Sequence, residues 1–395
     1  IHRYTVKRLR AEIEPVGARD FLRFLFAWQR VTADARMEGP NAVAAAVTQL
    51  EGFEAPAGAW ETEILPARIA EYEPAWLDDE CLAGRVAWAR LTPRNGQPDG
   101  AERGVSPVRT TPIALLARRH APLWTALSAN GQAVQPSGRA RAVADFIGEH
   151  GASFFDEITE GVGLLRPQVE DALAELVALG LVTSDSFGGL RALLVPSDKR
   201  TPSTGGRRRR RTIAYGMEDA GRWALAGRGK AASGEAVEHA ARTLLLRYGV
   251  VFWRVLEREA GWLPPWRELL RVYRRLEARG EIRGGRFVTG FSGEQFALPD
   301  AIGLLRATRR GNGSAEWISL SGADPLNLAG ILTPGPKLAA LTGNRLLYRD
   351  GLPVASLTGG DTHFYEALDP GTEWQARKAL LRGAKSAAMA DLSAR

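Results

Sequence analysis

Four arginines of this chain lie at the spacing of one helix face. Arg267, Arg271 and Arg274 occupy positions i, i+4 and i+7, and Arg275 lies beside them. In a helix these guanidinium groups share the side opposite the apolar stripe. Arginines on an exposed face neutralise phosphates, and without Asn or Gln for adenine they position a nucleic acid rather than read its bases. We therefore predict DNA binding by Arg267, Arg271, Arg274 and Arg275, opposite an inward stripe of Leu269, Val272, Tyr273 and Leu276.

Two further features carry related chemistry, and each leaves two interpretations open. Trp266 begins the same helix, where it either stacks on an unpaired base or anchors the helix in the core. A run of five arginines lies in a linker that is rich in Gly, Ser and Pro. Such a run either contacts several phosphates, with strong salt dependence, or stays a solvated linker. Its members are Arg207, Arg208, Arg209, Arg210 and Arg211.

Motifs for catalysis are weak by comparison. The GRGK at 227–230 and the GPK at 335–337 lack the spacing of a GxxxxGK[ST] phosphate-binding loop. The five histidines are scattered, and none has a metal-binding partner at i+4. The GFSGE at 290–294 is typical of a turn, and Asp324 is typical of an Asx turn. We predict neither a metal site nor a cofactor in this chain.

The arginine helix belongs to the second of two related segments. The first copy spans residues 150–194, and the second copy spans residues 248–298. Each copy predicts a short helix, a longer helix, a glycine stop and a two-stranded hairpin, which is the order of a winged helix-turn-helix. The matched positions are Gly151, Phe154, Phe155, Ile158, Val169, Leu173, Leu176, Gly180, Val182 and Phe187 in the first copy, and Gly249, Phe252, Trp253, Leu256, Leu269, Tyr273, Leu276, Gly280, Ile282 and Phe287 in the second.

The long helices of the two copies differ in charge. In the first copy this helix carries Glu170, Asp171 and Glu175, and carboxylates that face a phosphate backbone would repel it. We therefore predict that the first copy contacts protein or serves as a scaffold, while the second copy meets DNA.

The rest of the chain predicts an α+β, helix-rich fold in which tandem winged helix-turn-helix modules precede a small β-barrel-like module. Asp350-Gly351 between two apolar runs indicates a hairpin in that module. The expected parts are a linking helix (1–16), a diverged winged-helix-like unit with an extra strand (17–137), a winged helix (138–196), an arginine-rich linker (197–216), a winged helix (217–300), a β-rich module (301–365), and a C-terminal helix or tail (366–395).

The net charge, the cysteine count and the lack of a long apolar run limit the kind of partner and the cellular location that we expect. The net charge of +7 favours a polyanionic partner, although arginine enrichment in a GC-rich genome gives the same value. The single cysteine, Cys81, excludes a disulfide framework, is expected to be buried, and favours a reducing, cytoplasmic location. No apolar run is long enough to span a membrane. Because the first residue is Ile1 rather than Met, we expect a piece of a longer polypeptide.

Several long strings resemble one family. They are PVGARDFLRFLFAWQRV, LEGFEAPAGAWETEILPARIAEYEPAWLDDECLAGRVAWARL, GASFFDEI, GGRFVTGFSGEQFALPDA, GADPLNLAGILTPG and GNRLLYRDGLPVA. Together they resemble the C-terminal region of the bacterial large helicase-related proteins, the Lhr family. The resemblance implies an N-terminal pair of RecA-like motor domains, outside this chain, that use ATP and Mg to translocate 3′-to-5′ on single-stranded DNA. It also implies DNA repair, an array of winged helices, and assembly of protomers through that array.

A more distant likeness concerns the AlkZ-type DNA glycosylases, which also combine tandem winged helices with a β-rich segment. Those enzymes carry a catalytic Gln-x-Gln or Gln-x-Asp, and the matching stretch here is LEGFEAP at 50–56. It has Glu54 in place of the first glutamine and Pro56 in place of the second motif residue, so the motif is altered. Glu54 is a candidate to position a water or to stabilise an oxocarbenium-like cation, and the alternative is a loop carboxylate without a catalytic role.

Three functions follow as hypotheses. The first is DNA binding and oligomerisation by the C-terminal region of an ATP-dependent DNA repair helicase, with single-stranded or forked DNA as the partner. The second is a DNA glycosylase that removes a modified base such as uracil. The third is a module for protein assembly alone, in which the winged helices pack on one another and on neighbouring protomers.

Overall fold

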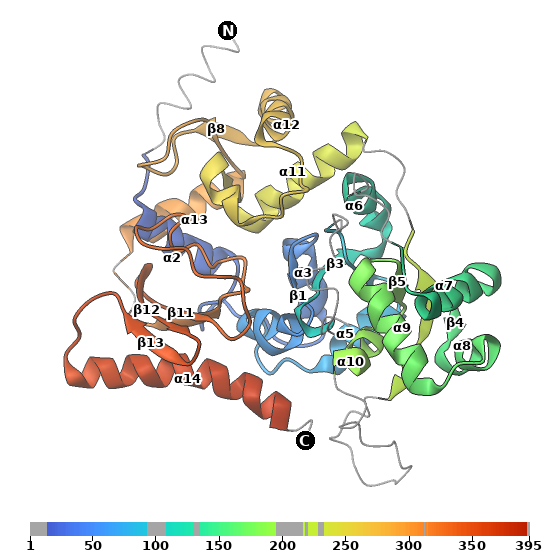
Figure 1. The fold of residues 1–395 in the computed structure, drawn as a ribbon. Helices are drawn as coiled ribbons and strands as arrows, with labels where there is room; N and C mark the ends of the chain where they lie inside the picture. The colour runs from blue at the N-terminus through green and yellow to red at the C-terminus, as the bar shows by residue number, and fades with distance from the viewer. Residues whose placement is uncertain are drawn as a thin grey trace. The chain divides into compact units, whose positions relative to one another are not determined.

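The computed structural model describes residues 14–92, 108–128, 135–194, 216–217, 220–227, 233–311, 313 and 315–392, and the side chains up to residue 381. The chain divides into two compact units. Unit 1 comprises residues 1–39, 63–71 and 234–386, and unit 2 comprises residues 40–62, 72–233 and 387–395. Figure 1 shows their elements.

Unit 1 contains the second copy, and its topology is that of a winged helix. Helix α11 (Gly234–Tyr248) is followed by β7 (Val250–Val251), the 3₁₀-helix η6 (Trp253–Arg258) and α12 (Trp266–Ala278). Strands β8 (Arg283–Gly285) and β9 (Gln295–Ala297) form the predicted hairpin, and the antiparallel sheet has the order β7-β9-β8. Gly249 and Gly280 adopt positive φ angles of 66° and 79° at the two helix ends, where glycine avoids the clash of a Cβ.

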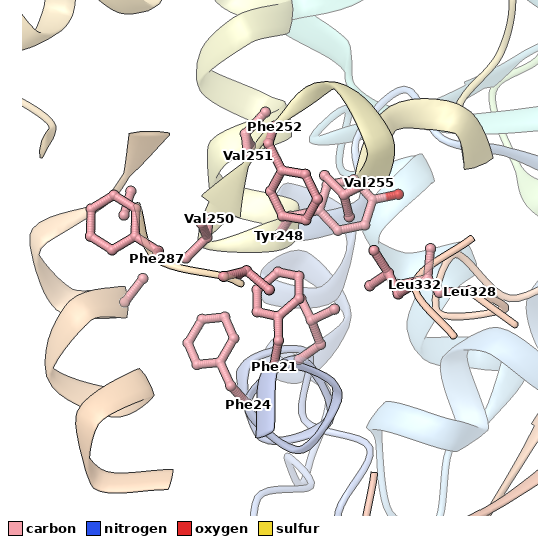
Figure 2. Packing of buried hydrophobic residues seen from close by; sticks show 14 of the residues in the cluster. Phe21, Phe24, Tyr248, Val250, Val251, Phe252, Val255, Phe287, Leu328 and Leu332 are labelled. Carbon is pink, nitrogen blue, oxygen red and sulfur yellow. The ribbon is translucent and has the colours of Figure 1, made fainter. Parts of the chain in front are cut away.

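A helix from the start of the chain completes the core of this winged helix. Helix α2 (Ala18–Trp28) buries five large apolar residues, namely Phe21, Leu22, Phe24, Leu25 and Phe26. Figure 2 shows its Phe21 and Phe24 facing Val250 and Phe252 of the second copy. Helix α13 (Pro299–Arg310) also packs on α2. Residues from both ends of the sequence therefore share one hydrophobic core.

The β-rich module of unit 1 is an open sheet, so the predicted barrel-like closure is wrong. Strands β10 (Trp317–Ser321), β11 (Arg345–Arg349), β12 (Leu352–Thr358) and β13 (Asp361–Phe364) are antiparallel in that order. Four strands are too few to enclose a filled interior, so each face is covered separately. Leu346 contributes to the core that α2 completes, whereas Leu347 packs against α14 (Pro370–Leu392), which lies along the sheet in Figure 1.

The hairpin between β11 and β12 confirms the Asp350-Gly351 prediction. Both residues have positive φ angles, 51° and 76°, as a two-residue turn of this kind requires. A Cβ on Gly351 would lie 2.2 Å from the carbonyl oxygen of Arg19, so glycine also permits close packing on α2. Asp350 forms an ion pair with Arg23 at an N···O distance of 3.2 Å, which joins the turn to α2.

The loop after β10 is held by a buried ion pair. Asp324 forms the predicted Asx turn, because its Oδ1 accepts a hydrogen bond from the backbone N–H of Leu326 at 2.9 Å. Both of its carboxylate oxygens also accept bonds from the guanidinium of Arg68, at 2.8 and 3.0 Å. Arg68 ends α4 (Leu65–Arg68), which follows the π-helix η1 (Trp60–Ile64). The pair therefore joins parts of unit 1 that are 256 residues apart.

Unit 2 contains the three-stranded antiparallel sheet β1-β3-β2. Its strands are β1 (Glu54–Pro56), β2 (Val86–Ala89) and β3 (Pro112–Ala117), and β3 is central between the other two. Cys81 is buried as predicted, and burial raises the pKa of its thiol to about 12. Helical elements surround the sheet: α3 (Asn41–Leu50), α5 (Pro74–Leu82), η2 (Val108–Thr110), η3 (Arg118–His120) and α6 (Ala121–Ser128).

The first copy also lies in unit 2, but its predicted hairpin is wrong. Residues Phe187–Leu194 form helix α10 instead of the second hairpin strand. The helix buries Phe187 and Leu190, and its Arg191 donates to the carboxylates of Glu61 and Asp78. The sheet of the first copy instead takes its central strand from β6 (Arg222–Leu225), which pairs with β4 and β5. This strand lies near the start of the range predicted as the next winged helix, 217–300. The other elements are α7 (Gly138–His150), β4 (Ser153–Phe154), α8 (Phe155–Val162), α9 (Arg166–Leu179) and β5 (Val182–Ser184).

The two copies align over the long helix and the strand after it, but not at the short helix. Phe155 and Ile158 are buried in the first copy, whereas Phe252 and Val255 are buried in the second. The predicted partners of Phe155 and Ile158, Trp253 and Leu256, are therefore shifted by one residue. The reason is a shorter connection in the second copy, where β7 follows Gly249 directly. The sheet orders, β4-β6-β5 and β7-β9-β8, are equivalent.

Candidate nucleic-acid interface

Helix α12 presents the predicted arginine face to solvent. Leu269, Val272, Tyr273 and Leu276 are all buried, which confirms the inward stripe. The side chains of the opposite face are exposed, namely Arg267, Arg271, Arg274 and Arg275. The 3.6-residue period of the sequence therefore predicted both faces correctly.

Ion pairs divide these four arginines into two groups. Arg274 makes a two-point contact with Glu294, with both N···O distances at 3.0 Å, and Arg275 lies 3.8 Å from Glu238. Arg267 and Arg271 make no ion pair within the part of the chain that the structure describes. The positive charge available to an anionic partner is therefore concentrated in the first half of α12.

The wing adds two cations that the sequence reasoning missed. Arg283 and Arg286 are exposed on either side of Gly284-Gly285, and within the described ranges neither forms an ion pair. Their signal in the sequence is the pair of arginines that flanks two glycines inside a predicted hairpin. Residues 266–294 contain seven arginines and four glutamates, so this segment carries a net positive charge.

The wing is anchored on both sides. The buried Gln295 side chain accepts hydrogen bonds from the backbone N–H groups of Phe287 and Val288, both at 2.8 Å. Val16, just before α2, donates to the carbonyl of Phe287 and accepts from the N–H of Thr289, again at 2.8 Å. These bonds fix the wing loop before any ligand arrives. The GFSGE stretch forms the turn that was predicted, with positive φ at Gly290 and Gly293.

Trp266 is half-buried and packs against the core. Its ring lies 5.9 Å from that of Tyr273, measured between centroids. This contact favours the interpretation of Trp266 as a core anchor over a role in stacking on a base. The arginine run at 207–211 lies outside the described residues, so its DNA-binding role stays a prediction.

The long helix of the first copy differs in its surroundings. Ala174, Val177 and Ala178 of α9 are buried in addition to its core stripe. Arg90, just after β2, donates to the carbonyl of Ala178 at 2.6 Å, and η2 packs on the same helix. Within unit 2 this helix therefore packs against neighbouring elements through its apolar residues, and the role of its acidic residues toward a partner stays a prediction.

Glu54 lies at the start of β1 with its carboxylate engaged. Its Oε1 accepts from the backbone N–H groups of Leu91 and Thr92 at 2.7 and 2.8 Å, and its Oε2 accepts from the hydroxyl of Thr92. The half-buried side chain thus holds the chain just after β2.

The fold and this surface define a protein of tandem winged helices in which the long helix of the second copy has a cationic outer face. Residues 16–118 and residues 230–317 each match the family model of the large helicase-related protein, winged-helix domain. The chain is 28% identical over 322 residues to a "Lhr helicase/ probable uracil glycosylase" of Mycolicibacterium smegmatis, covering 78% of this chain and 20% of that protein. It is also 28% identical over 371 residues to a "Lhr helicase/uracil glycosylase" of Escherichia coli K12, covering 84% of this chain and 23% of that protein.

The chain therefore contains winged-helix domains of the large helicase-related (Lhr) type and is a distant homologue of Lhr helicase/uracil glycosylase proteins over most of its length. This confirms the resemblance seen in the sequence. The chain spans about a fifth of the length of these curated relatives. Among the described residues, no helix has both the length and the apolar character needed to cross a membrane.

Proposed function

We propose that this chain binds DNA through the second copy, with Arg267 and Arg271 of α12 and Arg283 and Arg286 of the wing contacting phosphates. The observation that carries the proposal is that these four exposed arginines have no ion-pair partner among the described residues. Pairing them with phosphates releases counterions, which is the main source of affinity for such a surface. Helix α12 carries no Asn or Gln to pair with adenine, so we expect these arginines to contact phosphates rather than to select a sequence.

The wider setting of this activity is also a proposal. The relatives' names support a place for the chain in a DNA helicase whose ATP-driven motor lies outside the sequence given. The acidic long helix of the first copy, which would repel a phosphate backbone, supports a second role in assembly, in which protomers associate while the second copy remains open to DNA. The mass of the chain in solution tests this role, because a monomer would contradict it.

Titration of the chain with duplex and single-stranded DNA tests the main proposal. We expect the logarithm of the binding constant to fall linearly with the logarithm of salt concentration, with a slope of about −3.6 for four duplex phosphates. Steady-state fluorescence anisotropy at several salt concentrations gives this slope. A slope near zero, or binding to one sequence alone, would contradict phosphate contact as the main source of affinity.

The relatives' names favour a second candidate function, the removal of uracil from DNA. Glu54 is the carboxylate that we propose for it, acting on a water or on the sugar cation. Its three hydrogen bonds would hold the carboxylate in one orientation, as a positioned acid or base requires.

Cleavage of uracil-containing DNA after alkaline treatment, without ATP, tests this candidate. We expect cleavage by the natural chain and a loss of about 100-fold or more in Glu54→Gln, in the range typical of a removed acid–base group. Thr92→Val is the matched control, since it removes one bond to the carboxylate but keeps the carboxylate itself. Equal cleavage by Glu54→Gln and the natural chain would assign Glu54 to structure alone.

A further inference from the structure

One aromatic side chain of the second copy is exposed without a structural reason. Trp253, the first residue of η6, has 56% of its surface exposed. Among the described residues its ring has no aromatic or cationic partner, and its indole N–H has no acceptor. The large apolar ring and the N–H of a tryptophan both gain from contact with a partner, so this side chain is suited to bind a ligand.

The backbone around Trp253 is fixed, so the exposure is not a consequence of a loose segment. Phe252, just before the helix, and Val255, within it, are fully buried. Figure 2 shows both side chains among the packed residues of the hydrophobic core. Arg254 donates to the carbonyls of Ile331 and Gly330 at 3.0 and 3.3 Å, which fastens the neighbouring side of η6. Trp253 therefore projects from a rigid support and loses little conformational freedom when it binds.

The equivalence of the two copies places Trp253 beside the start of α12. With Phe252 matched to Phe155, Trp253 takes the position of Asp156, and Trp266 takes the position of Arg166. In the first copy Asp156 and Arg166 form an ion pair at 2.9 Å, so these two positions are adjacent in the fold. By analogy with the first copy, we expect the exposed indole to lie near the half of α12 that carries Arg267 and Arg271.

A flat aromatic ring next to unpaired cations suits one class of ligand. Single-stranded nucleic acid offers base faces that stack on aromatic side chains, and its phosphates pair with nearby arginines. The bases of an intact duplex are already stacked on each other, so a blunt duplex offers a ring no base face except at its end.

We propose that Trp253 stacks on an unpaired base where duplex DNA gives way to a single strand, and thereby sets a preference for such junctions. This inference rests on the proposed DNA binding by α12 and the wing, and it adds the DNA structure that the same surface selects. In this arrangement the arginines bind the phosphates of the duplex, and the indole stacks on the first unpaired base next to the end of the duplex.

Three DNA probes test this inference with the full chain: a blunt duplex, the same duplex with a short single-stranded overhang, and the same overhang built from abasic nucleotides. We expect the natural chain to prefer the base-bearing overhang over the abasic one. Trp253→Ala should weaken binding to the base-bearing overhang by about 5- to 150-fold and leave the other two affinities unchanged. Trp253→Phe should recover part of the loss, and indole fluorescence should be quenched by the base-bearing overhang alone.

Trp374→Ala is the matched control, because Trp374 is 62% exposed on α14, away from the second copy in sequence. It should bind all three probes like the natural chain. Equal losses for Trp253→Ala on base-bearing and abasic overhangs, or no loss at all, would overturn the stacking role while leaving the duplex binding intact. Failure of the natural chain to bind the blunt duplex with salt dependence would overturn the proposed function, and this inference with it.

Discussion

Replacing Arg267 and Arg271 together with alanine should weaken DNA binding by about 60-fold at 0.1 M salt. Each arginine that pairs with a duplex phosphate contributes about 0.9 to the slope of log binding constant against log salt concentration. Loss of both should reduce the slope by about 1.8 on any DNA sequence. These two residues are chosen because they have no ion-pair partner within the described ranges, whereas Arg274 is held by Glu294.

Two further variants make the measurement specific to α12. Arg306→Ala/Arg310→Ala removes the same charge from the exposed side of α13, so it should change the slope by much less. Arg274→Ala should have a smaller effect than either Arg267→Ala or Arg271→Ala, since its contact with DNA must compete with Glu294. Anisotropy titrations over a range of salt concentrations give all these slopes. A slope unchanged in the double variant would remove the first half of α12 from the DNA-binding surface.

Arg68→Ala should destabilise unit 1 by about 3–5 kcal/mol, the cost of leaving one buried charge without its partner. Arg68 is fully buried, and it donates two hydrogen bonds to Asp324 and one to the side-chain carbonyl of Gln29 at 2.7 Å. Its loss leaves the Asp324 carboxylate in the interior with only the backbone N–H of Leu326 as a donor among these contacts. The affected groups come from three separate stretches of the chain, so all of unit 1 should respond.

Amide hydrogen exchange measures this effect better than bulk denaturation, because a chain of two units need not unfold in one step. Protection of α2 and α11 amides should fall by the stated free energy in Arg68→Ala. Arg68→Met/Asp324→Leu should recover most of the loss, since replacing both charges removes the unpaired one. Arg377→Ala, which breaks the exposed pair with Glu373, should cost less than about 1 kcal/mol. Unchanged protection in Arg68→Ala would show that the pair does not stabilise unit 1.

Local sequence patterns correctly predicted the features that depend only on nearby residues, such as the two faces of a helix and a tight turn. The apolar stripe and arginine face of α12 follow from a period of 3.6, and the burial of Leu269 and Leu276 agrees with it. The turn at Asp350-Gly351 follows from the two positive φ angles that such a pair tolerates. These signals need no knowledge of the rest of the fold.

The same local patterns failed where two structures were equally compatible with them. The apolar run Phe187–Leu194 fits a strand as well as a helix, and burial of Arg191 on Glu61 and Asp78, more than a hundred residues away, accompanies the helical form. The register of the short helix in the second copy shifted by one residue, because Phe252 rather than Trp253 fills the core. In both cases the secondary structure or its register depended on which side chains another segment of the chain could bury.

The candidate DNA-binding site also combines features that the sequence predicted with features that only the tertiary structure showed. The sequence by itself determined that α12 is amphipathic and that its outer face is cationic. Only the tertiary structure decided that Glu294 binds Arg274 while Arg267 and Arg271 stay available, that the wing adds Arg283 and Arg286, and that Glu54 holds the chain after β2. The physical reason is range: helix periodicity and turn conformation depend on adjacent residues, whereas ion pairs, buried carboxylates and exposed aromatics depend on partners that folding brings from distant parts of the chain.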